Sequence, residues 1–141
     1  MSEKEDNIQK LYVEFQELDQ QIKQLEQQNN QLSAQLTDLT ATVHNLDDIK
    51  SIKNGTEILV PISGGIYAKA ELKDNKNFIV NVGSNVTTVK DVDSTKKLIE
   101  TQINEIKKLQ IRLIEELKNN TTKAKLIEQE INSIASTLQN N

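Results

Sequence analysis

The stretch that decides the fold is EILVPISGGIYAKAELKDNKNFIVNVGSNVTTVKD, residues 57–91. It contains three of the four glycines and the only proline of the chain, and it is rich in valine and isoleucine. Gly64-Gly65, the cluster at residues 74–77 and the cluster at residues 83–85 are turn signals. The segment is therefore predicted to form two consecutive β-hairpins, with strands at Glu57–Ser63, Ile66–Leu72, Phe78–Val82 and Val86–Lys90.

Apolar residues alternate with polar ones along these strands, but the first strand is apolar on both faces and is expected to be buried on both. Pro61 has no N–H to donate, so it is expected at an edge or a bulge. Four short strands cannot close a barrel, and their edges present unpaired backbone groups. We therefore expect the segment to assemble with other subunits. The candidate assembly residues are Ile58, Val60, Ile62, Ile66, Ala68, Ala70, Leu72, Phe78, Val80, Val82 and Val86.

Heptad spacing flanks this segment on both sides. The first series begins at Ile8 and has leucine at every d position, from Leu11 to Leu46; the second runs from Ile99 to Leu138. We call the a and d positions the seam. Polar residues fill three of its slots, Asn29, Gln110 and Asn120. Asn29 either sets the register or marks a tolerant position, and the sequence leaves both interpretations open.

Two heptad helices of similar length, joined by about 40 strand-forming residues, favour an antiparallel coiled-coil hairpin with the β-hairpins at the connecting end. The expected fold class is α+β, in a single domain with a helix over 1–54, hairpins over 55–92 and a helix over 93–141. Ser2 and Glu5 predict a capping box for the first helix. Asn54-Gly55 is expected to end it, and Asp93 or Ser94 to cap the second.

Composition argues against catalysis. The 141 residues include no cysteine and one histidine, His44, at an outward heptad position. We expect no catalytic residue, no metal ligand and no cofactor, and the chain is not expected to be an enzyme. With a net charge of −4 and an aromatic content of 3%, the chain is not expected to bind nucleic acid. No apolar run is long enough for a bilayer and the N-terminus does not resemble a signal peptide, which predicts a cytoplasmic protein with no membrane partner.

The LVPI strand, the glycine turn before IYAKAEL, and FIVNVGSNV before the second helix resemble the alpha-type subunits of the archaeal prefoldin family. The second hairpin is the alpha-type feature, since beta-type subunits carry one. The resemblance implies a hexamer of two alpha-type and four beta-type subunits, whose strands form a double β-barrel body. It also implies ATP-independent capture of unfolded client proteins at the helix ends and their delivery to a group II chaperonin.

The helix ends away from the hairpins, which we call the tip, are the expected client-binding surface. Most tip residues also fit an ordinary seam, and Tyr12, at position e, is the best candidate for a surface contact. The alternative function is a structural coiled-coil tether between fixed partners, which should seal its seam there. The candidate tip residues are Ile8, Leu11, Tyr12, Phe15, Ile127, Ile131, Ile134 and Leu138.

Overall fold

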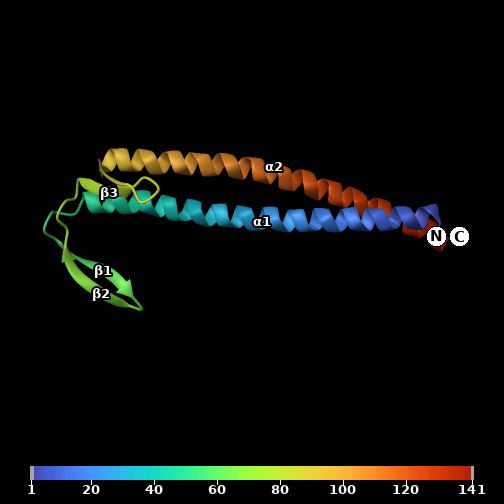
Figure 1. Cartoon of the computed structure of the whole chain (residues 1–141), viewed down its shortest axis with the longest axis horizontal. Coiled ribbons are helices and arrows are strands. Elements are labelled where there is room, and N and C mark those ends of the chain that lie inside the picture. Colours follow the sequence, from blue (N-terminus) through green and yellow to red (C-terminus); the bar gives the residue numbers. More distant parts are fainter. Residues whose placement is uncertain (1, 141) are drawn as a thin grey trace. The chain divides into compact units, whose positions relative to one another are not determined.

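A computed structural model describes residues 2–140. Along the chain, one long helix precedes four short strands and a second long helix follows them (Figure 1). This arrangement confirms the predicted α+β fold of two helices and two hairpins. The elements in chain order are α1 (Glu3–Lys50), β1 (Glu57–Ser63), β2 (Ile66–Glu71), β3 (Asn77–Asn81), β4 (Thr87–Asp91) and α2 (Val92–Gln139).

The chain divides into two compact units, each with its own packing. One contains the residues up to Ala34 together with those from Ile106 onward, and the other contains Gln35–Glu105. In the first unit, the N-terminal part of α1 packs against the C-terminal part of α2, so the helices are antiparallel there. The second unit holds both hairpins and the helix ends that adjoin them.

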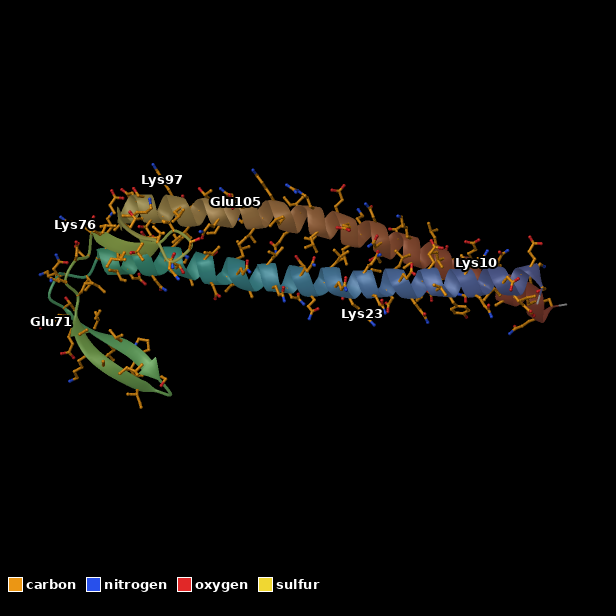
Figure 2. All side chains as sticks on the ribbon, viewed as in Figure 1. Lys10, Lys23, Glu71, Lys76, Lys97 and Glu105 are labelled. Atoms are coloured by element: carbon orange, nitrogen blue, oxygen red, sulfur yellow. The ribbon has the colours of Figure 1, made fainter. Side chains whose placement is uncertain are left out.

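Burial along the helices follows the predicted heptads. Every seam position from Ile8 to Leu46 and from Ile99 to Leu138 is buried or half-buried, including the three polar ones. Charged side chains such as Lys23 and Lys97 project outward instead (Figure 2). The seam is thus confirmed as the apolar core of the helical part. Its best-buried cluster is Leu18, Ala124, Ile127 and Ile131, with Leu11, Phe15 and Ile22 packed against it.

The two ends of α1 differ in how well the sequence predicted them. At the N-terminus the capping box is confirmed: the Glu5 N–H donates to Ser2 Oγ and the Ser2 N–H donates to Glu5 Oε2, both at 3.3 Å. At the C-terminus α1 ends at Lys50, four residues before the expected stop at Asn54-Gly55. The chain tightens there, because the Ile52 N–H donates to the Ile49 carbonyl at 3.0 Å, three residues back rather than four.

The cap of α2 is Asp91 rather than Asp93 or Ser94. The Ser94 N–H donates to Asp91 Oδ1 at 2.7 Å, and Thr95 Oγ1 donates to the Asp91 carbonyl at 2.7 Å. The hydrogen bond from the Ser94 N–H lowers the pKa of the Asp91 carboxyl below 3.8. The expectation was wrong because β4 extends to Asp91 and passes directly into the helix at Val92.

The first hairpin pairs β1 with β2 in antiparallel register, Ile58 opposite Ala70 and Val60 opposite Ala68. Gly64 and Gly65 form its turn with φ of +56° and +81°, a conformation that favours glycine. The register shifts between Pro61 and Ser63, which confirms the expected irregularity at the proline.

The second hairpin pairs β3 with β4, and Ile79 lies opposite Val89. Its turn has positive φ at Gly83, Ser84 and Asn85, and the Gly83 N–H donates to Asn81 Oδ1 at 2.9 Å. The hairpin joins α2 directly, because β4 ends at Asp91 and α2 begins at Val92. The Val92 N–H donates to the Lys76 carbonyl at 3.1 Å, next to the last pair of the hairpin.

Asn75, between the hairpins, ties the strands to the end of α1. Its Nδ2 donates to the Ile52 carbonyl at 2.7 Å and reaches the Lys50 carbonyl at 3.5 Å. Its own N–H donates to Asn54 Oδ1 at 2.8 Å. One side chain therefore satisfies carbonyls that the end of α1 leaves without helical partners.

Candidate functional site

The first hairpin leaves most of its apolar side chains in contact with solvent. Val60, Ile62 and Ile66 are 42%, 65% and 63% exposed, so the expectation that β1 is buried on both faces is wrong for this chain by itself. No other segment of the described chain covers the strand, and burial would need another chain. The remaining candidate assembly residues of this hairpin are half-buried: Ile58, Ala68, Ala70 and Leu72.

The second hairpin has one half-buried face and one exposed face. Phe78 and Val80 lie on the half-buried face. Ile79 and Val89, directly opposite each other, lie on the other face and are 78% and 68% exposed. The candidate residues nearer the turn, Val82 and Val86, are 48% and 58% exposed.

Four exposed apolar residues were absent from the predicted assembly set. On the first hairpin they are Leu59 and Tyr67, and on the second Ile79 and Val89. Side chains alternate between the two faces of a strand, so a residue next to a half-buried one is expected to point to the opposite, exposed face. Both faces of these strands carry apolar residues, so polarity alone could not show which face stays exposed. The Ile79–Val89 pair is the most exposed apolar pair that lies directly across a hairpin.

Four of the candidate tip residues share one cluster, because Leu11 and Phe15 pack against the buried group that contains Ile127 and Ile131. Ile127 and Ile131 are buried in the cluster around Leu18, at 9% and 5% exposure. Tyr12 is 51% exposed, in agreement with its heptad position. The other candidates are half-buried: Ile8, Leu11, Phe15, Ile134 and Leu138.

Val13, next to Tyr12, is 55% exposed and was missed by the seam analysis. With Asp6, Gln9 and Lys10 it lines a shallow hollow on the outer side of α1. Tyr12 and Val13 therefore form an exposed apolar pair on the N-terminal part of α1.

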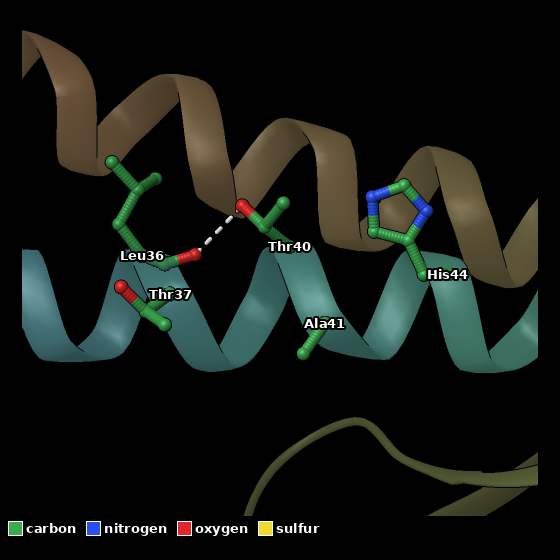
Figure 3. A pocket seen from close by; sticks show the side chains of 5 residues that line it. All are labelled: Leu36, Thr37, Thr40, Ala41 and His44. Carbon is green, nitrogen blue, oxygen red and sulfur yellow. Dashed lines mark hydrogen bonds between the residues drawn. The ribbon is translucent and has the colours of Figure 1, made fainter.

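The surface around His44 shows no catalytic arrangement. A shallow hollow in α1 is lined by Leu36, Thr37, Thr40, Ala41 and His44 (Figure 3). Thr40 Oγ1 donates to the Leu36 carbonyl of its own helix at 2.8 Å. Among the residues the structure describes, no three histidine, cysteine or acidic side chains gather as metal ligands would. Over the same residues, neither helix has a stretch apolar enough to cross a bilayer.

One ion pair connects the helices in the second unit. Lys96 Nζ lies 2.7 Å from Asp47 Oδ1, and this contact lowers the pKa of Asp47 and raises that of Lys96. Lys96 is half-buried and lies three residues before Ile99, where the seam of α2 begins. Both side chains are in contact with solvent, so the pair is expected to contribute little to stability.

The chain matches the family described as Prefoldin subunit over residues 18–137, which includes most of α1, both hairpins and nearly all of α2. The chain belongs to the prefoldin family. A prefoldin subunit is a component of a chaperone rather than an enzyme, and it assembles with other prefoldin subunits.

Individual relatives are archaeal prefoldin proteins. Prefoldin subunit alpha of Thermofilum pendens is 33% identical over 86 residues, which cover 61% of this chain and 67% of that protein. Prefoldin subunit alpha 1 of Thermococcus kodakarensis is 30% identical over 105 residues, covering 74% and 72%. With its two hairpins, the chain is an alpha-type prefoldin subunit of the archaeal kind.

A solved prefoldin structure has the same fold. It is titled as a cryo-EM structure of filamentous PFD from Methanocaldococcus jannaschii, and it matches with a TM-score of 0.73 at 20% identity. The match covers 82% of this chain and 95% of that one. At this identity the likeness supports the prefoldin fold of two helices and two hairpins.

Proposed function

We propose that the chain captures unfolded proteins at its tip, without ATP, and passes them to a group II chaperonin in the cytoplasm. It does so as one subunit of a hexamer of two alpha-type and four beta-type prefoldin subunits. The whole chain acts as a single prefoldin-type domain, in which the hairpins serve assembly and the helix ends serve capture. Membership in a chaperone family supports this proposal.

The observation that carries the capture step is the exposure of Tyr12 and Val13, at 51% and 55%. Their neighbours on the seam are half-buried, so these two side chains extend the apolar surface outward from a closed core. An amphipathic tyrosine and a small valine can contact many sequences, which an unselective binder requires. Ile127 and Ile131 are buried, and their role is to support the tip rather than to touch clients.

The proposed assembly surface includes the predicted strand residues together with the Ile79–Val89 pair. Each two-stranded hairpin has only edge strands, and neither buries its apolar side chains within the chain. Pairing with strands of beta-type subunits would satisfy those edges and remove the apolar residues from water.

The alternative, a structural tether, draws support from the buried Ile127 and Ile131, because a tether also closes its seam. A tether binds one specific partner, whereas a chaperone binds many unrelated proteins. The number of unrelated proteins that the assembled complex protects from aggregation therefore separates the two functions.

The test changes Tyr12→Ser together with Val13→Ser in a complex with beta-type partners. Losing about 1 kcal/mol of contact energy would weaken client binding roughly fivefold, and protection of several unrelated denatured proteins should fall accordingly. The control is Ile111→Ser with Ile114→Ser, a pair on α2 that is 66% and 51% exposed. Equal protection by the tip variant, the control and the unchanged complex would contradict capture through this pair.

A further inference from the structure

A polar layer interrupts the apolar seam in the unit that contains the helix termini. Gln110 of α2 donates from Nε2 to Asn29 Oδ1 at 3.3 Å and to Ser33 Oγ at 2.9 Å, both on α1. Asn29 and Gln110 are half-buried in seam slots. The seam residues on either side of them are all apolar: Leu25, Leu32, Ile106 and Leu113.

A second polar contact agrees with the same alignment of the helices. Asn120, also in a seam slot of α2, donates from Nδ2 to Gln21 Oε1 at 3.4 Å. Moving from Asn29 to Gln21 along α1 corresponds to moving from Gln110 to Asn120 along α2, in the opposite direction. One antiparallel register therefore satisfies both polar seam residues of α2 in this unit.

We infer that Asn29, Ser33 and Gln110 form a register lock that positions the tip. The apolar seam gives only a modest preference for one register, because a slip of one heptad, about 10 Å, sets apolar residues against apolar residues at most other seam positions. The polar layer does distinguish the registers. After such a slip Asn29 and Gln110 would each face an apolar residue, and a half-buried amide without a partner is costly.

The lock matters at the tip because the register decides which side chains meet there. In the observed register, Leu18 packs with Ala124, Ile127 and Ile131. A slip of seven residues would move α2 by two turns along α1 and change the surface beside Tyr12 and Val13. This consequence for client capture rests on the proposed function, whereas the register lock itself does not.

The register can be measured as a distance within the chain. The protein has no cysteine, so Glu17→Cys and Lys107→Cys place two spin labels at exposed positions on α1 and α2. Labelled chain is diluted with unlabelled chain in the assembled complex, so that distances within one chain dominate. Pulsed electron–electron double resonance should then give one distance between the two spin labels for the native sequence.

The decisive variant is Asn29→Leu with Gln110→Leu. It should melt at a higher temperature, because packed leucines replace polar groups in the seam, and it should gain a second distance displaced by about 10 Å. The matched control is the exchange Asn29→Gln with Gln110→Asn, which keeps an amide pair across the seam and should keep one distance.

A single native distance in the leucine variant would overturn the register lock and assign the register to the chain that connects the helices. If the second distance appears, protection of denatured proteins should fall in the leucine variant and recover in the exchange control. A second distance with undiminished protection would refute the positioning role at the tip. The Tyr12 and Val13 variant tests capture separately, because it leaves the polar layer intact.

Discussion

The seam and the hairpins use the same kinds of side chain in opposite ways. Along the helices, Leu46 and Ile131 are 7% and 5% exposed. On the second hairpin, Ile79 and Val89 are 78% and 68% exposed. All buried apolar residues of the described chain lie on α1 or α2, and none lies on a strand.

This difference shows where the chain supplies its own stability and where it depends on others. The helices form a core with each other, whereas each isolated two-stranded hairpin is marginal in water. Binding partners that recognise only the folded hairpins would stabilise them by mass action. Changes at the hairpins should therefore affect assembly, and changes at the seam should affect folding.

The largest effect is expected from Ile79→Asp with Val89→Asp. If this face is the proposed assembly surface, two charges on it should weaken the complex by roughly 100-fold or more, about 3 kcal/mol, because buried unpaired charges are unfavourable. Native mass spectrometry with beta-type partners should show dissociated subunits, while circular dichroism of the chain keeps its helical signal.

The control for this experiment is Ile79→Val with Val89→Ile, which keeps the face apolar and should leave the complex intact. An intact complex carrying both aspartates would mean that assembly uses other strand surfaces, and the comparison between seam and hairpins would lose its functional meaning.

The next effect concerns the seam. Ile131→Ala removes a side chain from the buried cluster and should destabilise the chain by about 2–5 kcal/mol, seen as a lower melting temperature. Ile111→Ala, on the same helix at 66% exposure, should change stability by no more than about 0.5 kcal/mol. Similar melting temperatures for the two variants would show that the cluster adds little to the stability of the helices.

The smallest effect is expected at the junction of β4 and α2. Asp91→Ala removes the cap from the Ser94 N–H and should lower the melting temperature slightly, whereas Asp93→Ala, which leaves that cap in place, should lower it less. Because folding lowers the pKa of the Asp91 carboxyl, its stabilisation is fully present well above the unfolded-state pKa and is lost as the pH falls through the folded-state pKa. Thermal melts should therefore show the difference between native chain and Asp91→Ala shrinking as the pH is lowered through the acidic range; a constant difference would exclude the ionised cap.

The sequence predicted the helices better than the hairpin surfaces, for a physical reason. A heptad marks one stripe of a helix, and leucine at every d position leaves one way to bury it. Ile79 and Val80 are adjacent and both apolar, so alternation assigns them to opposite faces without saying which face is exposed. The answer depends on what covers the strands.

The junctions were the least predictable part. Asp91, Asp93 and Ser94 are all good capping residues within four positions, and Asp91 becomes the cap because β4 runs up to it and α2 begins at Val92. Asn75 gave no signal in the sequence, because its partners lie more than 20 residues earlier in the chain. At the tip, heptad spacing marked Tyr12, at position e, as the best candidate for a surface contact, and its exposure of 51% agrees with that position, whereas Ile131 on the seam is 5% exposed.

The Asn75 contacts also bear on the order in which the chain folds. They join residues 21–25 positions apart, whereas the contact between Gln110 and Asn29 spans 81 positions and that between Asn120 and Gln21 spans 99. Contacts between residues near in sequence form with a smaller loss of chain entropy, so the Asn75 hydrogen bonds to the end of α1 should form first. The seam residues should then pair in order, starting near the hairpins and ending at the termini. During synthesis at 5–20 residues per second, the N-terminal leucines of α1 would wait roughly 5–25 seconds for their partners on α2 to emerge. During that time the apolar seam of α1 is exposed to solvent, so the subunit is itself an unfolded chain of the kind that it is proposed to shield.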